Sequence, residues 1–164
     1  MGGLETKTKN LAQALKRFHE AIQFYQYGQE GKLNLIGPIQ TEDLLLSLRD
    51  SMIQRFEFTV ELFWKFVKNY LEEKENVLVQ PGTPRSAILA AAKAALVSEP
   101  EAEGILNMFE SRNLTSHVYQ ERIAQELAGQ LPIILFDDGI YFSKAYTSMM
   151  RYFNLFSNSK HSCK

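Results

Sequence analysis

The sequence lacks the features that mark several classes of protein. It has one cysteine, Cys163, so it offers no partner for an intrachain disulfide and no thiolate metal site. No apolar run approaches the ~18 residues that a membrane span requires. The first ten residues, MGGLETKTKN, lack the apolar core of a signal peptide. We therefore expect a soluble, cytoplasmic protein in a reducing compartment, with no membrane association.

An excess of charge of one sign is also missing. The chain carries 18 Lys and Arg against 19 Asp and Glu, a formal net charge of -1. A protein that grips nucleic acid mainly through its phosphates usually has a large basic excess, so any RNA contact must come from a local site. Histidines are few, and His19 and His161 have neither acidic nor cysteine neighbours at ligand spacing. We expect no metal site and no cofactor.

The composition that is present is that of a globular protein. With 164 residues, 45% of them hydrophobic and 23% charged, the chain fits one domain. A domain of this size can bury roughly two thirds of its unfolded surface. We expect one helical domain over residues 1–156 and a disordered tail over residues 157–164.

Hydrophobic spacing and capping residues predict helices along the whole chain. The expected helices run from Leu11 to an end at Gly28, from Thr41 to Glu75, from a cap at Thr83 and Pro84 to Val97, from a capping box at Ser98 and Glu101, from a cap at Thr115 or Ser116 toward Pro132, and from Phe142 to Phe156. The stretch LPIILF is ambiguous between helix and strand. The predicted fold class is all-α, an up-down four-helix bundle with one or two extra helices.

The second of these helices is apolar on more than one face. Its main stripe holds Ile53, Phe56, Val60, Phe63, Val67 and Tyr70, and further apolar residues stand outside it at Met52, Phe58, Leu62 and Phe66. Such a helix is central in a bundle or shared with another subunit. We expect Trp64 in the core or a dimer interface rather than in a base-stacking platform. Glu57, Glu61, Lys65 and Lys68 form a stripe that is typical of a solvated, ion-paired face.

The stretch RNLTSHVY contains the candidate functional residues. Arg112 follows the apolar Phe109 by three residues, so on a helix it leaves from the buried stripe and needs a partner. Five residues at ~100° each place His117 about 140° from Arg112, so the helix must break between them or the two must meet across subunits. Thr115 and Ser116 suit a break, because they can cap the next helix. If the chain beyond is extended, His117 and Tyr119 point to the same side.

This stretch resembles the R-x4-H-x-Y signature of HEPN domains, the nucleotide-binding helical bundles of higher eukaryotes and prokaryotes. Asn113, directly after the arginine, is also typical of that signature. Three blocks, Asp50 to Glu73, Thr83 to Arg85 and Glu110 to Glu121, resemble the nucleotidyltransferase substrate-binding-like family in order and context. The resemblance covers about residues 8–130. The connection at residues 29–43 and the aromatic-rich ending after Gln130 depart from it.

The resemblance implies a homodimer of four-helix-bundle subunits, encoded beside a minimal nucleotidyltransferase that supplies the catalytic aspartates. This chain has no Gly-Ser dipeptide and no strand-borne acidic pair, so we do not expect it to be a nucleotidyltransferase itself. Members with the R-x4-H-x-Y form resemble toxins that cleave RNA without a metal. The partner silences these toxins by adding AMP to the tyrosine.

Residue roles follow from the same resemblance. It implies catalysis by Arg112, Asn113 and His117 and modification at Tyr119, and it assigns no nucleotide-binding residue. His117 would transfer protons, helped as a base if it lies in the first turn of a helix, and Arg112 would neutralise charge on the reacting phosphate. Because one chain offers one such histidine, an acid and base pair would need both subunits.

Two other interpretations stay open. The chain can be a non-catalytic subunit that binds nucleotide only in complex with the nucleotidyltransferase, or a structural dimerisation bundle with a vestigial motif. By spacing alone, an arginine and a histidine at a helix junction are more often a structural ion pair and a cap than a catalytic pair. Arg85 is most simply a first-turn residue, although its position would also let it face a phosphate.

Overall fold

The chain is helical throughout the part that the structure describes. The computed structural model describes residues 3–33, 41–117 and 120–136, the last five of these by backbone alone. The helices are α1 (Leu4–Gln29), α2 (Thr41–Lys74), α3 (Pro84–Lys93), α4 (Glu99–Leu114), the short 3-10 helix η1 (Thr115–His117) and α5 (Glu121–Phe136). The all-α class is confirmed. The expected last helix at 142–156 and the tail at 157–164 lie outside the described residues.

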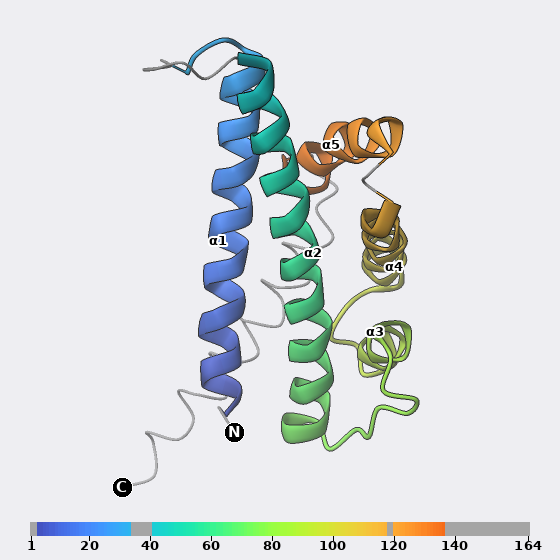
Figure 1. Cartoon of the computed structure of the whole chain (residues 1–164). Coiled ribbons are helices and arrows are strands. Elements are labelled where there is room, and N and C mark those ends of the chain that lie inside the picture. The colour runs from blue at the N-terminus through green and yellow to red at the C-terminus, as the bar shows by residue number, and fades with distance from the viewer. Residues whose placement is uncertain (1–2, 34–40, 118–119, 137–164) are drawn as a thin grey trace, which may run out of the picture.

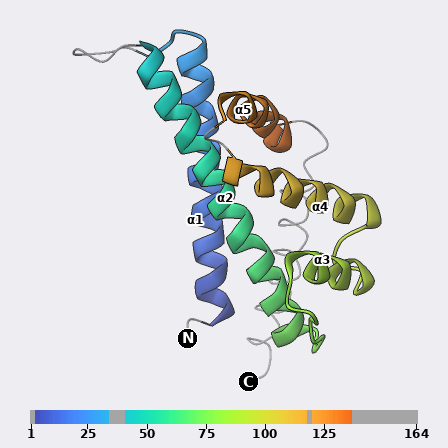
Figure 2. The ribbon, with the colours of Figure 1, turned by 45° about the vertical axis from the view of Figure 1, so that its right-hand side comes forward.

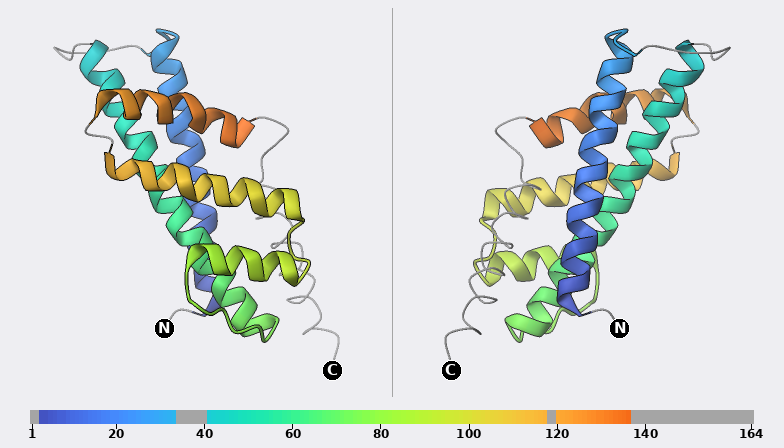
Figure 3. Two further views of the ribbon diagram at one scale, coloured as in Figure 1. Left: turned by 90° about the vertical axis from the view of Figure 1, so that its right-hand side faces the viewer. Right: turned by 90° about the vertical axis from the view of Figure 1, so that its left-hand side faces the viewer.

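The helices form a hairpin with three crossing helices. The long helices α1 and α2 lie side by side and antiparallel, and α3, α4 and α5 stack along one side of this hairpin (Figures 1 and 2). Figure 3 shows that the three shorter helices lie across the hairpin and alternate in direction. The structure is therefore a helical bundle, but its short helices cross the long pair where an up-down arrangement would have them alongside it. The homodimer stays a prediction.

Helix α2 is the centre of the core. All six residues of its main apolar stripe are buried, and Met52 and Phe66 outside the stripe are buried as well. The ring of Phe56 contacts that of Phe18 on α1, with 5.7 Å between their centroids. Helices α1, α3, α4 and α5 all contact α2. Of the two alternatives for this helix, the structure shows the central position, and sharing with another subunit stays a prediction. Phe58 is 58% exposed.

The end of α1 differs from the prediction. The helix continues through Gly28 to Gln29, and Gly31 takes the left-handed conformation (φ +66°) that closes the last turn. There the Lys32 N–H donates to the Tyr27 carbonyl at 2.9 Å. Gly28 serves close packing instead, because a Cβ at that position would come within 2.9 Å of the Leu45 side chain on α2.

Helices α3 and α4 begin where their caps predict. Thr83 with Ser86, and Ser98 with Glu101, form reciprocal capping boxes. Helix α3 ends at Lys93, four residues before the predicted end at Val97. The chain turns out of the helix at Ala95 (φ 57°), and this turn brings Leu96 and Val97 into the core.

Helix α5 also differs from the prediction at both ends. It begins at Glu121, with Gln120 in the capping position, and it continues past Pro132 to Phe136. Proline removes one backbone hydrogen bond from a helix interior and kinks or weakens the helix, but it does not always end it. The ambiguous stretch LPIILF is therefore helical. No helix in the described ranges combines the length and hydrophobicity that a membrane span requires.

A buried arginine fastens α5 to α2. Arg49 is 7% exposed, and its guanidinium donates to Glu121 of α5 and to the neighbouring Asp50. The hydrogen bond from Arg49 lowers the pKa of Glu121 below its usual value, with help from Gln125 and the arginine's charge and against a smaller opposing effect of burial. A charge as buried as that of Arg49 is tolerated only when it is paired.

The phenylalanines of α2 give a matched test of the core. We expect Phe56→Ala to lower the free energy of unfolding by about 3–5 kcal/mol, because it empties a fully buried site. Phe58→Ala removes the same side chain from the surface and should change stability by no more than about 0.5 kcal/mol. Urea unfolding followed by circular dichroism measures both, and equal losses would contradict the assignment of the core.

The Arg49–Glu121 pair should make stability depend on pH. The folded pKa of Glu121 lies below its unfolded value of about 4.3, so its contribution is complete above that value and is lost as pH falls through the folded pKa. The wild type should therefore unfold at higher urea than Glu121→Gln at pH 7, and the gap should close toward pH 3. Glu126→Gln, which removes an exposed pair with Arg122, is the control. A gap that stays constant over this range would refute the linkage.

Candidate functional site

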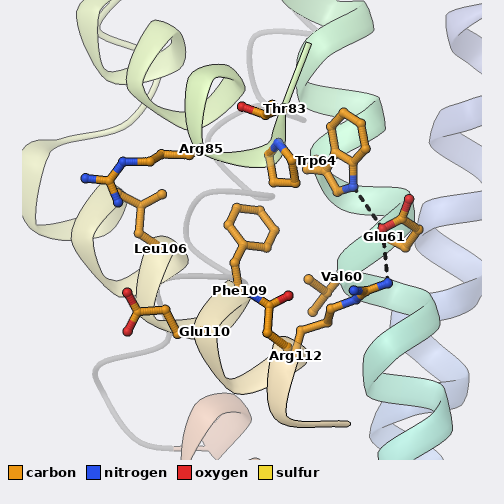
Figure 4. Close-up of a pocket in the computed structure, with 11 residues that line it drawn as sticks. Val60, Glu61, Trp64, Thr83, Arg85, Leu106, Phe109, Glu110 and Arg112 are labelled. Carbon is orange, nitrogen blue, oxygen red and sulfur yellow. Dashed lines mark hydrogen bonds and ion pairs between the residues drawn. The ribbon is translucent and has the colours of Figure 1, made fainter. Parts of the chain in front are cut away.

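A pocket opens where α4 and the start of α3 cross α2 (Figure 4). Its volume is about 310 Å³. Its lining comes from α2 (Val60, Glu61, Trp64), from the entry to α3 (Thr83, Pro84, Arg85) and from α4 (Leu106, Phe109, Glu110, Arg112, Asn113). The pocket thus joins parts of all three blocks that carry the family resemblance.

Arg112 reaches this pocket from the last turn of α4. The helix buries Ile105, Met108 and Phe109, and Arg112 follows on the same side, facing α2. Its Nη2 atom lies 3.7 Å from Glu57 Oε1 and 3.7 Å from Glu61 Oε2. The partner that the sequence predicts for this arginine is therefore present. Its Nε atom is buried and has no hydrogen-bond partner among the described residues.

Glu61 is the acidic centre of the site. It is half-buried, and it accepts hydrogen bonds from Trp64 Nε1 at 3.0 Å and from Lys65, whose Nζ lies 2.8 Å away. Burial alone would raise the pKa of Glu61, but the hydrogen bonds from Lys65 and Trp64 and the charge of Arg112 outweigh it and hold the pKa below its usual value. At neutral pH this residue is therefore a fixed anion that orients Trp64 and Arg112.

The predicted solvated face of α2 is only partly solvated. Lys65 is exposed and pairs with Glu61, as expected of such a face. Glu57 and Glu61 are half-buried because the end of α4 crosses α2 at this level. Trp64 is also half-buried and lines the pocket, so it belongs neither wholly to the core nor wholly to the surface.

Arg85 brings a second guanidinium to the pocket. It is the second residue of α3, just after the Thr83 cap and Pro84, and it is exposed. It makes no ion pair with any residue in the described ranges. In Figure 4 it lies on the side of the pocket away from Arg112, with Phe109 between the two. Two cationic side chains from separate elements therefore border one cavity.

The turn after α4 confirms the predicted break between Arg112 and His117. The α-helix ends at Leu114, and Thr115–His117 form η1. The hydroxyl of Thr115 donates to the Arg112 carbonyl at 2.7 Å, and that of Ser116 donates to the Asn113 carbonyl at 2.9 Å. The prediction that these hydroxyls cap the following helix is wrong, because they donate backward to carbonyls in the last turn of α4.

The structure brings only part of the predicted site together. Arg112 and Asn113 line the pocket, whereas His117 is exposed and does not line it. His117 also precedes α5 and does not lie in its first turn. Tyr119 lies outside the described residues, so the convergence of arginine, histidine and tyrosine in one cleft stays a prediction. Among the described residues no three His, Cys, Asp or Glu side chains gather as a metal ion would require.

Comparison with known proteins places the chain in a family. A crystal structure of a protein from Thermus thermophilus shares 28% sequence identity with it at a TM-score of 0.53, covering 82% of this chain and 97% of that one. No curated protein matches. The family model described as "nucleotidyltransferase substrate binding protein like" matches residues 6–154, which include every pocket residue and the stretch from Arg112 to Tyr119. The chain belongs to this family of nucleotidyltransferase substrate-binding-like proteins.

Proposed function

We propose that this chain is the cytoplasmic partner subunit of a minimal nucleotidyltransferase encoded by an adjacent gene. We further propose that it is a metal-independent ribonuclease of the HEPN type, and that its partner inactivates it by transferring AMP to Tyr119. The family supports the partnership. The single observation that supports the ribonuclease is the end of α4 between Arg112 and His117, which leaves the imidazole exposed on a turn.

The proposed reaction needs one base and one acid. A neutral histidine takes the proton of a ribose 2′-hydroxyl, whose oxygen attacks the adjacent phosphorus and displaces the 5′-oxygen. A protonated histidine gives a proton to that leaving oxygen, so the products are a 2′,3′-cyclic phosphate and a free 5′-hydroxyl. Each chain supplies one His117, so a homodimer that places two of them at one cleft is part of this proposal.

Arg112 and Asn113 would bind the reacting phosphate. The guanidinium presents several donors that match phosphate oxygens, and it would stabilise the charge that grows on them. Its contacts with Glu57 and Glu61, at 3.7 Å each, are longer than a close ion pair, and its side chain is 36% exposed. A phosphate can therefore compete with these carboxylates for the arginine. Asn113 is exposed beside it and adds a neutral donor.

Tyr119 suits a switch because of its distance along the chain from His117. Two residues span at most about 7 Å of backbone, so a nucleotide joined to Tyr119 would be attached close to the residue that carries the imidazole. The added AMP carries a negative phosphodiester and the bulk of a nucleoside. It would repel the RNA backbone and occupy the space that the scissile phosphate needs.

A second function is favoured by the pocket itself. Its volume falls within the lower range of small-molecule sites, and Arg85, Arg112 and Trp64 line it while His117 does not. On this view the chain is a non-catalytic subunit that binds nucleotide only in the complex, and presents it or an acceptor to the nucleotidyltransferase. This view predicts nucleotide binding without RNA cleavage.

Replacement of His117 tests the ribonuclease. We expect His117→Ala to abolish RNA cleavage in the presence of a chelator and the growth arrest caused by the wild-type chain, because no other residue of the segment transfers protons near neutral pH. His19→Gln, which changes a histidine on α1, should cleave at the wild-type rate. Circular dichroism checks that both variants fold, and cleavage by His117→Ala at the original rate would exclude the proposed role.

Mass spectrometry of the chain coexpressed with the adjacent nucleotidyltransferase tests the switch. We expect a mass gain of one or more AMP units, located on Tyr119 and absent from Tyr119→Phe. The modified wild type should have lost its RNA cleavage. Nucleotide that copurifies with the complex while the chain itself stays unmodified would reject the switch in favour of the binding subunit.

A further inference from the structure

We infer that the pocket between Arg85 and Arg112 binds a nucleoside monophosphate, either free or as one unit of an RNA strand. This inference deepens the proposed function, since it assigns a nucleotide-binding site that neither the sequence nor the family description locates. It concerns binding at the crossing of α2, α3 and α4, and it does not depend on proton transfer by His117.

Arg85 supplies the phosphate end of the site. Arg85 borders the pocket without an ion-pair partner in the described part of the chain. Arg112 lies on the opposite side of the pocket, where its Nη2 atom is 3.7 Å from both Glu57 and Glu61. Phosphate oxygens are strong acceptors for arginine. A phosphate beside Arg85 would therefore give this exposed guanidinium an anionic partner.

The start of α3 adds to the attraction for an anion. Thr83, Pro84 and Arg85 are the cap and first two residues of this ten-residue helix, and all three line the pocket. The positive end of the helix dipole therefore borders the cavity, where it favours negative charge by a few tenths of a kcal/mol up to about 1 kcal/mol. The capping box fixes the backbone here, so Arg85 leaves from a rigid turn.

Apolar side chains supply the base end of the site. Trp64, Phe109 and Leu106 lie around the cavity between the two arginines (Figure 4). The hydrogen bond from the Trp64 indole to Glu61 holds this ring in one orientation. A fixed aromatic surface stacks on a nucleobase at low entropic cost, and the neighbouring arginines add cation–π contacts.

Size and charge select one phosphate. A pocket of about 310 Å³ is near the small end of ligand sites, which favours a single nucleotide. Its lining carries Glu61 and Glu110 as well as the two arginines, so its formal charges cancel. A single phosphate can be matched to Arg85, whereas the extra charges of a triphosphate would be repelled by the carboxylates.

Calorimetry on the purified full chain tests the site. AMP should bind with a Kd below about 1 mM, and adenosine and inorganic phosphate should each bind at least about tenfold more weakly, because each fills only half of the site. Trp64 is the only tryptophan of the chain, so its fluorescence, excited where adenine does not absorb, should change with AMP at the same midpoint. Absence of AMP binding at millimolar concentration would overturn the inference.

A matched pair of α3 variants locates the phosphate. Arg85→Gln should weaken AMP binding about tenfold, whereas Lys93→Gln removes the same charge from the exposed far end of the same helix and should change it less than twofold. Equal effects of the two variants would overturn the assignment to this pocket. ATP should bind more weakly than AMP, and tighter binding of ATP would also contradict the charge argument.

The source of the nucleotide is settled by the dinucleotide ApA. Displacement of AMP by ApA at similar concentration indicates a site for an RNA strand, and AMP binding without such displacement indicates a site for the free mononucleotide. Both outcomes support the inference. RNA cleavage by the same preparations separates it from the proposed function: cleavage without AMP binding would refute the site alone, and AMP binding without cleavage would refute the ribonuclease alone.

Discussion

The structure depends on one constraint, which is that α2 is apolar around most of its circumference and must be covered from several sides. Helix α1 covers one side along its full length, and α3, α4 and α5 cover another at successive levels. Some polar residues of α2, such as Glu57 and Glu61, therefore become half-buried where a short helix crosses them. The pocket lies where α4 and the start of α3 cross α2, so its position follows from the packing of the core.

The electrostatics of the site bear on how a chain with almost no net charge would bind an anion, as we propose. The guanidiniums of Arg85 and Arg112 are held within a few side chains of Glu61 and Glu110, so the positive charge is local and has little reach. Such a site does not draw in nucleic acid over long distances. As proposed, it would discriminate at contact, where a phosphate beside Arg85 must avoid the carboxylates of Glu61 and Glu110.

Much of the fold could be predicted from local pattern. The bounds of α2 agree with prediction to within one residue, and the starts of α3 and α4 follow from capping boxes whose chemistry is contained in four residues. Features with two physical readings were predicted less well. Gly28 fits both a helix end and a close approach between helices, and a threonine hydroxyl can accept from a following N–H or donate to a preceding carbonyl. Only the tertiary packing decides between them.

The site was predicted in part for the same reason. The sequence predicts that Arg112 needs a partner, because this residue follows a buried stripe. The sequence does not identify that partner, because Glu57 and Glu61 resemble any other charged helix face until the structure shows α4 crossing them. Trp64 and Arg85 are likewise joined to Arg112 only by helix crossing angles. Sequence periodicity predicts which face of a helix is buried, but it does not predict which other helix covers that face.

The hydroxyl of Thr115 has a mechanical consequence. This residue is buried, and it is bonded to the carbonyl of the arginine three residues before it. The turn that carries the imidazole and the last turn of α4 are therefore joined as one rigid piece. A partner protein that moved this turn outward would also move the end of α4. The same movement would separate the Arg112 guanidinium from Glu57 and Glu61, so Arg112 and His117 would be displaced together.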